Sequence, residues 1–276
     1  MRRCITFLVL IVWIVFQLGC NAPRSAANHN QSNGGSGAAN AQANKNPTPA
    51  HAVTPPDLRP SGPPDTSFKS CNPYYPLVPG SQAKYTVKKP TGPPASVSLI
   101  VDSAVENGKK VFKEVTQKVE GEASMAKVET TTRKYICNAD RIELLSSIID
   151  NKIGLTATGR MESTFPSTAT IMIAPSSLKP GASWSYLMRV NITMSGKPEV
   201  TRQTVFLNFK VEESENITVP AGTFKALRVA AKVNGKQVDE YYAPGIGLVK
   251  RIVPGGGAWE LTQYTGLTPS QMKKRL

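Results

Sequence analysis

Two glycines near the carboxyl end of the chain, Gly245 and Gly247, have the G-x-G spacing found in phosphate-binding loops. They lie in the stretch YYAPGIGLVKRI, residues 241–252, which also carries a lysine and an arginine. A phosphate loop needs a following helix, whose amino end faces the anion, and a further glycine or Gly-Lys-Ser/Thr spacing. Here the glycines precede branched apolar residues that are typical of a strand. The stretch therefore predicts a turn between antiparallel strands and no nucleotide site.

Histidine occurs only at His29 and His51, both in an Asn-, Ala-, Gly- and Pro-rich region where solvated side chains are expected. A folded part without histidine lacks the Ser-His-Asp and Cys-His systems and the usual imidazole zinc sites. We therefore predict no catalytic residues, no metal site and no cofactor, and a protein that is not an enzyme.

Only carboxylate or lysine chemistry remains for an enzyme, and a retaining glycosidase would need two carboxylates that converge in a cleft. The candidates stand beside lysine and arginine in polar strand ends or turns, so we expect solvated surface charges: Glu212, Glu213, Glu215, Asp239 and Glu240. A carboxylate-dependent hydrolase remains the less favoured alternative.

The amino terminus, MRRCITFLVLIVWIVFQLGC, places two arginines before an apolar run that ends at Gly19-Cys20. This layout predicts a signal peptide over residues 1–20, because the run is short for a membrane span. The segment resembles a bacterial lipoprotein signal, which implies lipid attachment at Cys20, although Gln17 and Leu18 depart from the usual pattern. Cleavage near Ala22 and an uncleaved signal anchor are the alternatives, and all three predict export.

Residues 21–70 contain almost no large apolar side chains, so they cannot bury enough surface to offset their chain entropy. We expect a disordered tether there, a β-rich domain over residues 71–265 and a basic tail over 266–276. The domain keeps two cysteines, Cys71 and Cys137. An even number in an oxidising compartment predicts a disulfide between them, with two free thiols as the alternative.

Apolar and polar residues alternate through several segments of the domain, with many β-branched residues. The segments expected to form strands are 96–105, 110–119, 205–213, 224–233 and 247–253, and turns such as ENGKK, VNGKQ and VPGGGAW separate them. The pattern predicts a mostly β fold, an antiparallel meander that forms a curved sheet or an incomplete barrel.

A weak internal repeat accompanies this pattern. PLVPGSQAKY (76–85) resembles SLKPGASWSY (177–186), and RKYICNADRIELL (133–145) falls at a similar position to EYYAPGIGLVKRI (240–252). Two matches in the same order indicate two similar halves, with chance similarity of Pro-Gly turns as the alternative.

The segments ESENITVPAGTFKALRV, YYAPGIGLVKRI and WELTQY together resemble a family of exported bacterial lipoprotein-like proteins with no assigned activity. NPYYPLVPGSQAKY resembles the opening segment of that family, with Ala83 and Lys84 where a tryptophan is usual. The resemblance implies a curved antiparallel sheet or incomplete barrel, broadly like the half-barrels that carry lipoproteins across the periplasm. It supplies no catalytic residues.

The chain is basic, with a formal net charge of +14 overall, and residues 71–276 hold 27 lysines and arginines against 17 acidic residues. We predict a non-catalytic binding or structural domain of the cell envelope. The lipid anchor attaches it to the membrane, and its expected partner is either an anionic envelope polymer or an apolar ligand. There is no specific nucleic-acid signal. The alternative is a carrier-like half-barrel whose concave face holds the apolar ligand among aromatic side chains: Trp184, Tyr186, Phe206, Phe224, Tyr242 and Trp259. In similar lipoproteins the residue after the lipidated cysteine directs sorting between the two membranes. Asn21 at this position favours the outer membrane, with the domain facing the periplasm.

Overall fold

The computed structural model describes residues 58–266, apart from 66, 94, 122–124, 155, 166–168, 196, 234 and 256. The predicted signal peptide with Cys20, residues 21–57 of the predicted tether and residues 267–276 of the predicted tail lie outside this description. Within it, no helix is long and apolar enough to cross a membrane.

Antiparallel strands form nearly all of the described structure, together with one short 3-10 turn, η2 (Pro175–Ser177). The strands are β1 (Gln82–Lys88), β2 (Ala95–Glu106), β3 (Lys109–Glu120), β4 (Lys127–Asn138), β5 (Arg141–Ile153), β6 (Thr156–Thr164), β7 (Ala169–Met172), β8 (Ser183–Met194), β9 (Thr201–Val219), β10 (Gly222–Val233), β11 (Lys236–Ala243), β12 (Gly247–Val253) and β13 (Gly257–Thr265). Each segment in which the sequence predicted a strand lies within one of them. The predicted mostly β, antiparallel fold is confirmed.

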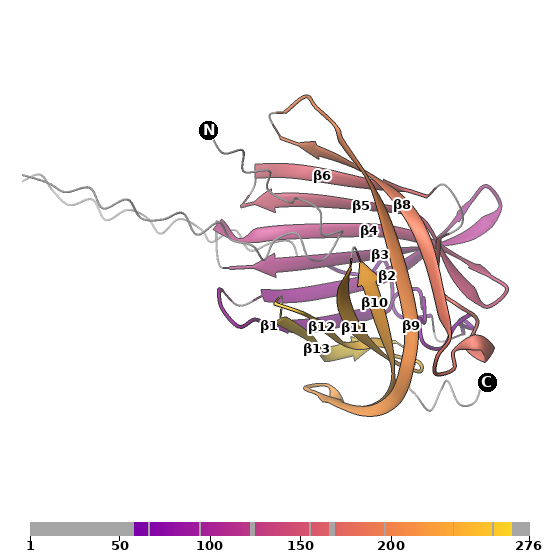
Figure 1. Ribbon diagram of the computed structural model, residues 1–276. Coiled ribbons are helices and arrows are strands. Elements are labelled where there is room, and N and C mark those ends of the chain that lie inside the picture. Colours follow the sequence, from indigo (N-terminus) through magenta and orange to yellow (C-terminus); the bar gives the residue numbers. More distant parts are fainter. Residues whose placement is uncertain are drawn as a thin grey trace, which may run out of the picture.

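Twelve of the thirteen described strands form a closed antiparallel barrel. Each pairs with its neighbour along the chain, β6 pairs with β8, and β13 returns to pair with β1 from Gln82↔Thr265 to Lys88↔Ala258. The remaining strand, β7, pairs with residues 142–144 of β5, next to the part of β5 that pairs with β6. In Figure 1, β2–β6 lie side by side in one layer, and β8, β9 and β10 cross in front of them.

The barrel consists of two equivalent six-stranded meanders, β1–β6 and β8–β13. Advancing six places around the barrel converts the order of one half into the order of the other. The two Pro-Gly turns make the same backbone contacts: Gly80 N donates to Val101 O at 2.7 Å, and Gly181 N donates to Val211 O at 2.8 Å. The similarity between residues 76–85 and 177–186 therefore has a counterpart in the structure.

Successive side chains of a strand point to opposite faces, so alternate residues of each barrel strand point into the barrel. The main core joins both halves and includes Val101, Phe112, Ile142, Leu207 and Val229. A second core packs the end of the β9–β10 hairpin against β1, β2 and β11–β13, where Ile217 and Val219 contact the group that includes Tyr85 and Trp259. Ala221, at the tip of this VPAGTF hairpin, donates its N–H to Leu261 O at 3.0 Å.

The segment Cys71–Leu77, called the strap here, lies against the turns at one end of the barrel. Asn72, which is fully buried, donates through Nδ2 to Ile173 O at 2.9 Å, and Pro73 O accepts from Gly245 N at 2.7 Å. A disulfide joins Cys71 to Cys137 of β4, with 6.1 Å between the Cα atoms. The strap is thus tied both to the β4–β5 end and to the β11–β12 turn.

Residues ahead of the strap, from the last part of the predicted tether, also contact the domain. Leu58 O accepts a hydrogen bond from Gln82 Nε2 at 3.1 Å, and Ser61 donates through Oγ to Asp102 at 2.6 Å. Phe68 packs on Phe112 with 5.3 Å between ring centroids. Leu58 is therefore held near the start of β1, where β1 pairs with the end of β13.

Candidate functional site

A cavity of about 180 Å³ lies inside the barrel. A twelve-stranded barrel is wider than the eight-stranded barrels whose interior side chains just fill the space. Most of its wall is apolar, and strands of both halves contribute, including Leu99, Trp184, Leu207, Phe209, Val229 and Ala231. The rings of Trp184 and Phe209 stack with 5.1 Å between their centroids.

The first polar cluster in the cavity wall surrounds Glu114 of β3, a carboxylate only 4% exposed. Arg133 of β4 donates through Nη1 to Glu114 Oε1 at 3.0 Å. Two tyrosine hydroxyls also donate to the carboxylate, Tyr75 to Oε2 at 2.9 Å and Tyr135 to Oε1 at 3.3 Å. The strap thus supplies one member of the cluster through Tyr75.

The second polar cluster surrounds Glu240 of β11, which is 8% exposed. Arg251 of β12 donates through Nε to Glu240 Oε1 at 2.8 Å, and the hydroxyl of Tyr242 donates to Oε2 at 2.6 Å. The guanidinium of Arg251 also lies 5.1 Å from the ring centroid of Trp259. Each cluster therefore contains one arginine, one glutamate and at least one tyrosine.

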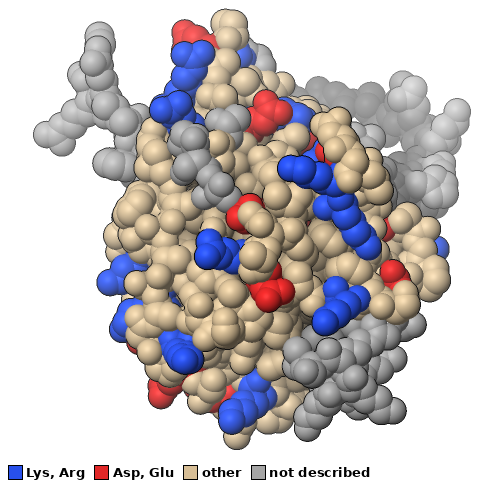
Figure 2. Space-filling model, turned by 90° about the vertical axis from the view of Figure 1, so that its right-hand side faces the viewer, with Lys and Arg blue, Asp and Glu red and all other residues tan. Residues whose placement is uncertain are grey.

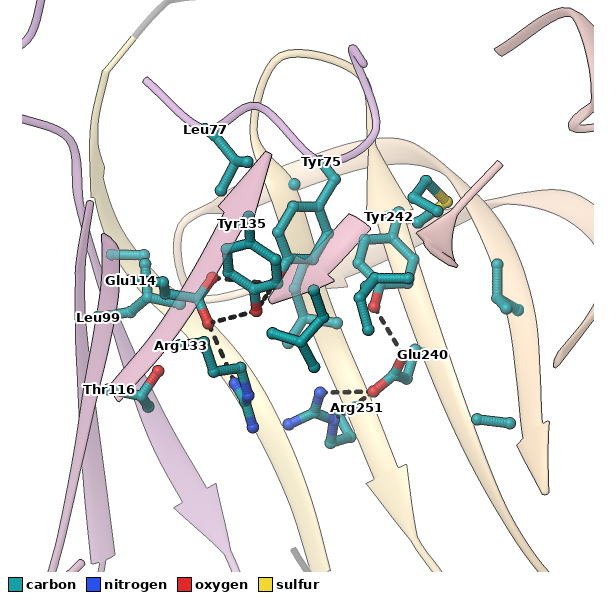
Figure 3. A pocket seen from close by; sticks show the side chains of 18 of the residues that line it. Tyr75, Leu77, Leu99, Glu114, Thr116, Arg133, Tyr135, Glu240, Tyr242 and Arg251 are labelled. Carbon is teal, nitrogen blue, oxygen red and sulfur yellow. Dashed lines mark hydrogen bonds and ion pairs between the residues drawn. The ribbon is translucent and has the colours of Figure 1, made fainter. Parts of the chain in front are cut away.

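The two clusters meet at Tyr75. Its ring lies 5.6 Å from that of Tyr135 and 6.2 Å from that of Tyr242, centroid to centroid, and Figure 3 shows it between them. Tyr135 and Tyr242 occupy the same position in the two halves, since the similar segments 133–145 and 240–252 align them. The strap residue therefore bridges equivalent positions of the two meanders.

The electrostatics of the site favour charged arginines and neutral tyrosines. Burial alone would lower the pKa of Arg133 and Arg251, but Tyr135 and Glu114 raise the pKa of Arg133, and Glu240 raises that of Arg251. Burial raises the pKa of the Tyr75, Tyr135 and Tyr242 hydroxyls, and the nearby carboxylates add to that shift. The hydroxyls therefore stay protonated and can donate.

Two hydroxyls in the cavity wall have no hydrogen-bond partner among the described residues: Thr116 Oγ1 of β3 and Ser147 Oγ of β5. Both residues are 3% exposed. Thr116 is paired with Thr131 and Ser147 with Arg133, so the two hydroxyl-bearing residues flank β4 on opposite sides. Buried polar groups normally have partners, so these hydroxyls are candidate ligand contacts.

Four of the six aromatic residues expected on the concave face line the cavity: Trp184, Tyr186, Tyr242 and Trp259. The other two do not, because Phe206 is 49% exposed and Phe224 packs at the edge of the second core. The expectation of a solvated surface charge is wrong for Glu240, which the inward face of β11 buries beside Arg251.

Glu114, Arg133, Arg251, Tyr75 and Tyr135 were not identified from the sequence as site residues. A signal existed for Glu114, since it lies two residues from Phe112 and from Thr116 and so shares a strand face with them. The predicted turn within residues 241–252 is confirmed: Gly245 and Gly247 have φ of 79° and 87° and lie where β11 connects to the antiparallel strand β12.

Other potential sites are less developed. The described residues contain no group of three histidine, cysteine or acidic side chains that could hold a metal ion. Lysine and arginine side chains are spread over the face shown in Figure 2, with acidic side chains between them. Several lysines and arginines of the described residues have acidic partners, such as Lys88 with Glu260 at 2.6 Å and Lys134 with Glu106 at 2.6 Å. The interior cavity is therefore the stronger candidate.

Comparison with known proteins gives one family match and two matches among solved structures. The DUF3108-like family matches residues 79–251. A candidate exported protein with a YmcC-like fold from Bacteroides fragilis has 13% identity and a TM-score of 0.41, covering 67% of this chain and 95% of its own. A candidate lipoprotein from Parabacteroides distasonis has 14% identity and a TM-score of 0.40, covering 71% of this chain and 100% of its own. The comparison with curated proteins gives no significant match.

Proposed function

The chain belongs to the DUF3108-like family, and we propose that it is a non-catalytic binding protein of the bacterial cell envelope whose barrel interior holds a largely apolar ligand. The observation that carries this proposal is the cavity of about 180 Å³, with apolar walls and a few convergent polar groups. That combination is typical of small-molecule binding sites.

The location in the envelope rests on the amino-terminal sequence. Arg2 and Arg3, the apolar run and Cys20 support export followed by lipid attachment, and Asn21 supports the outer membrane. The Cys71–Cys137 disulfide fits an oxidising compartment. In this arrangement the predicted tether holds the barrel away from the membrane surface to which Cys20 is attached.

Binding is favoured over catalysis by the chemistry of the two clusters. The carboxylates of the two clusters, Glu114 and Glu240, are each engaged by an arginine and by at least one tyrosine hydroxyl. A general acid or base must be free to exchange a proton with a substrate, and carboxylates held by charged guanidiniums are poor candidates for that role. The clusters are suited to shaping and polarising the cavity.

The test is to identify what the barrel carries. The full chain is expressed with export, purified in mild detergent and denatured, and the released small molecules are analysed by mass spectrometry. An Ala231→Phe variant fills the cavity, and Ala104→Phe, at an exposed position of β2, is the matched control. We expect a compound that is released by the unmodified chain and by Ala104→Phe and is depleted in Ala231→Phe. The same compounds in equal amounts from all three proteins would contradict the proposal.

A further inference from the structure

We propose that the cavity selects a small, uncharged ligand that carries a hydrogen-bonding group, such as a hydroxyl or an amide, on an apolar body. This inference rests on the proposed function and adds the chemical class of the ligand. It follows from the size of the cavity, the balance of charge around it and the two hydroxyls of its wall.

The size of the cavity limits the ligand. A dry protein cavity of about 150 Å³ is known to accept benzene, and the cavity in this barrel measures about 180 Å³. The enclosed part of the ligand is therefore of about the size of a benzene ring with one substituent. A long acyl chain would extend beyond this volume.

The charges around the cavity are already balanced. Arg133 is paired with Glu114, and Arg251 is paired with Glu240, so the two clusters together carry no net charge. Glu114, Glu240 and Arg251 are each less than 10% exposed. A carboxylate or ammonium group on the ligand would become a buried charge without a counter-ion, which is strongly unfavourable.

The hydroxyls provide the polar contact that an uncharged ligand needs. Thr116 Oγ1 and Ser147 Oγ are buried and have no partner within the described part of the chain. Figure 3 shows Thr116 near Arg133, at the polar part of the cavity. A hydroxyl can donate or accept, so one alcohol or amide group reaching this position would satisfy groups that are otherwise left unpaired.

The experiment compares four probes that share one ring: toluene, benzyl alcohol, benzoate and benzylammonium. Their affinities for the full chain in detergent are measured by titration calorimetry at neutral pH. The Ala231→Phe variant, in the same detergent, corrects for partition of the probes into micelles. We expect benzyl alcohol to bind most tightly, and benzoate and benzylammonium to bind at least about tenfold more weakly.

Substitutions in the cavity wall test whether its two hydroxyls make the polar contact with the ligand. Thr116→Val keeps the side-chain shape and removes the hydroxyl, and Ser147→Ala removes the second hydroxyl in case Thr116→Val does not fold. Thr86→Val, at an exposed position of β1, is the matched control. We expect Thr116→Val or Ser147→Ala to weaken benzyl alcohol by about fivefold and to leave toluene unchanged.

The outcomes separate the two proposals. If none of the probes binds the unmodified chain better than Ala231→Phe, the proposed function fails and the ligand class fails with it. If toluene binds as tightly as benzyl alcohol, and the hydroxyl variants change neither affinity, the cavity is a binding site and the ligand class is wrong. Tight binding of benzoate or benzylammonium would likewise overturn the ligand class alone.

Discussion

At the scale of single residues, the barrel interior is unusual in holding two ion pairs within a mainly apolar wall. Glu240 and Arg251 face each other across β11 and β12, and their side chains are each 11% exposed. Such a pair is compatible with a stable protein only if both partners are present, because the attraction between the two charges then offsets the cost of removing them from water. Loss of one partner leaves the other charge buried and uncompensated.

Replacement of Glu240 by leucine should therefore destabilise the protein by about 3–5 kcal/mol. The double variant Glu240→Leu with Arg251→Met removes both charges and should recover much of that loss. Glu213→Leu, at an exposed position of β9, is the control and should change stability by less than about 0.5 kcal/mol. Denaturant unfolding measures all three. A double variant no more stable than Glu240→Leu alone would contradict this account of the pair.

Because several tyrosines are buried, we expect the folded protein to lose stability at alkaline pH. Burial raises the pKa of Tyr75, Tyr85, Tyr135, Tyr186 and Tyr242 above the ordinary value of 10.0. Above that pH the unfolded chain loses these protons while the folded protein keeps them. The unfolded state then binds fewer protons, so the free energy of unfolding is intact below pH 10 and falls as the pH rises above it.

Tyr186→Phe tests this linkage, because it removes one titrating hydroxyl and keeps the ring that packs on Phe165 and Phe209. Each such tyrosine contributes a slope of about 1.4 kcal/mol per pH unit. The variant should therefore lose stability less steeply above pH 10, by about that amount per pH unit. Urea unfolding at a series of alkaline pH values gives the slope, and identical slopes for the two proteins would show that Tyr186 titrates normally in the folded state.

At the scale of the elements, the β12–β13 turn provides a matched pair of glycines. Gly255 and Gly257 both have positive φ, 71° and 92°. A Cβ on Gly255 would meet nothing within 4 Å, whereas a Cβ on Gly257 would lie 2.1 Å from Lys88 O of β1. The second position combines backbone strain with a collision at the β1–β13 junction that closes the barrel.

Gly255→Ala should cost about 1–2 kcal/mol, the strain of a left-handed alanine. Gly257→Ala should cost clearly more, because β1 and β13 must also separate where Lys88 pairs with Ala258. Thermal unfolding of the two variants gives the comparison. Equal shifts in Tm would mean that the contact with Lys88 O is relieved without disturbing the closure.

Local sequence patterns were sufficient to predict five of the thirteen described strands, β2, β3, β9, β10 and β12. Alternation in residues 205–213 and 224–233 predicted β9 and β10, and Pro-Gly and Asn-Gly marked the turns. The closure was beyond local patterns, since it joins Gln82 to Thr265 across nearly the whole domain. The buried charges were missed because charged side chains are normally expected on the surface. The strand face that Glu114 shares with Phe112 becomes a barrel interior only when the sheet closes.

At the scale of the whole molecule, the two meanders β1–β6 and β8–β13 explain how the site is assembled. One half supplies Glu114, Arg133 and Tyr135, and the other supplies Glu240, Tyr242 and Arg251. The halves meet at two junctions, β13 with β1 and β6 with β8. At the first junction the two ends of the domain pair with each other without a chain segment that connects β13 to β1. At the second junction a continuous segment of the chain connects β6 to β8.

This equivalence predicts that the domain tolerates circular permutation, in which a linker connects β13 to β1 and the chain is opened between β6 and β8. Leu58 is held at Gln82, and Gln82 is opposite Thr265, so a short Gly/Ser linker can join residue 266 to residue 58. New termini between Leu178 and Lys179 fall just before the Pro-Gly turn that starts β8, the counterpart of the turn before β1. The permuted chain keeps every strand pairing of the barrel.

We expect this permuted domain to fold with the far-ultraviolet circular dichroism of the original order and to unfold in one cooperative transition. A second permuted chain, opened between Asn208 and Phe209, is the control. It interrupts β9 where that strand pairs with both β8 and β10, so it should not fold. If both permuted chains fold equally well, the position of the opening is irrelevant and the two-half description has no bearing on assembly. If neither folds, the continuous β6–β8 connection is required for folding, and the two junctions are not interchangeable in spite of their matching hydrogen bonds.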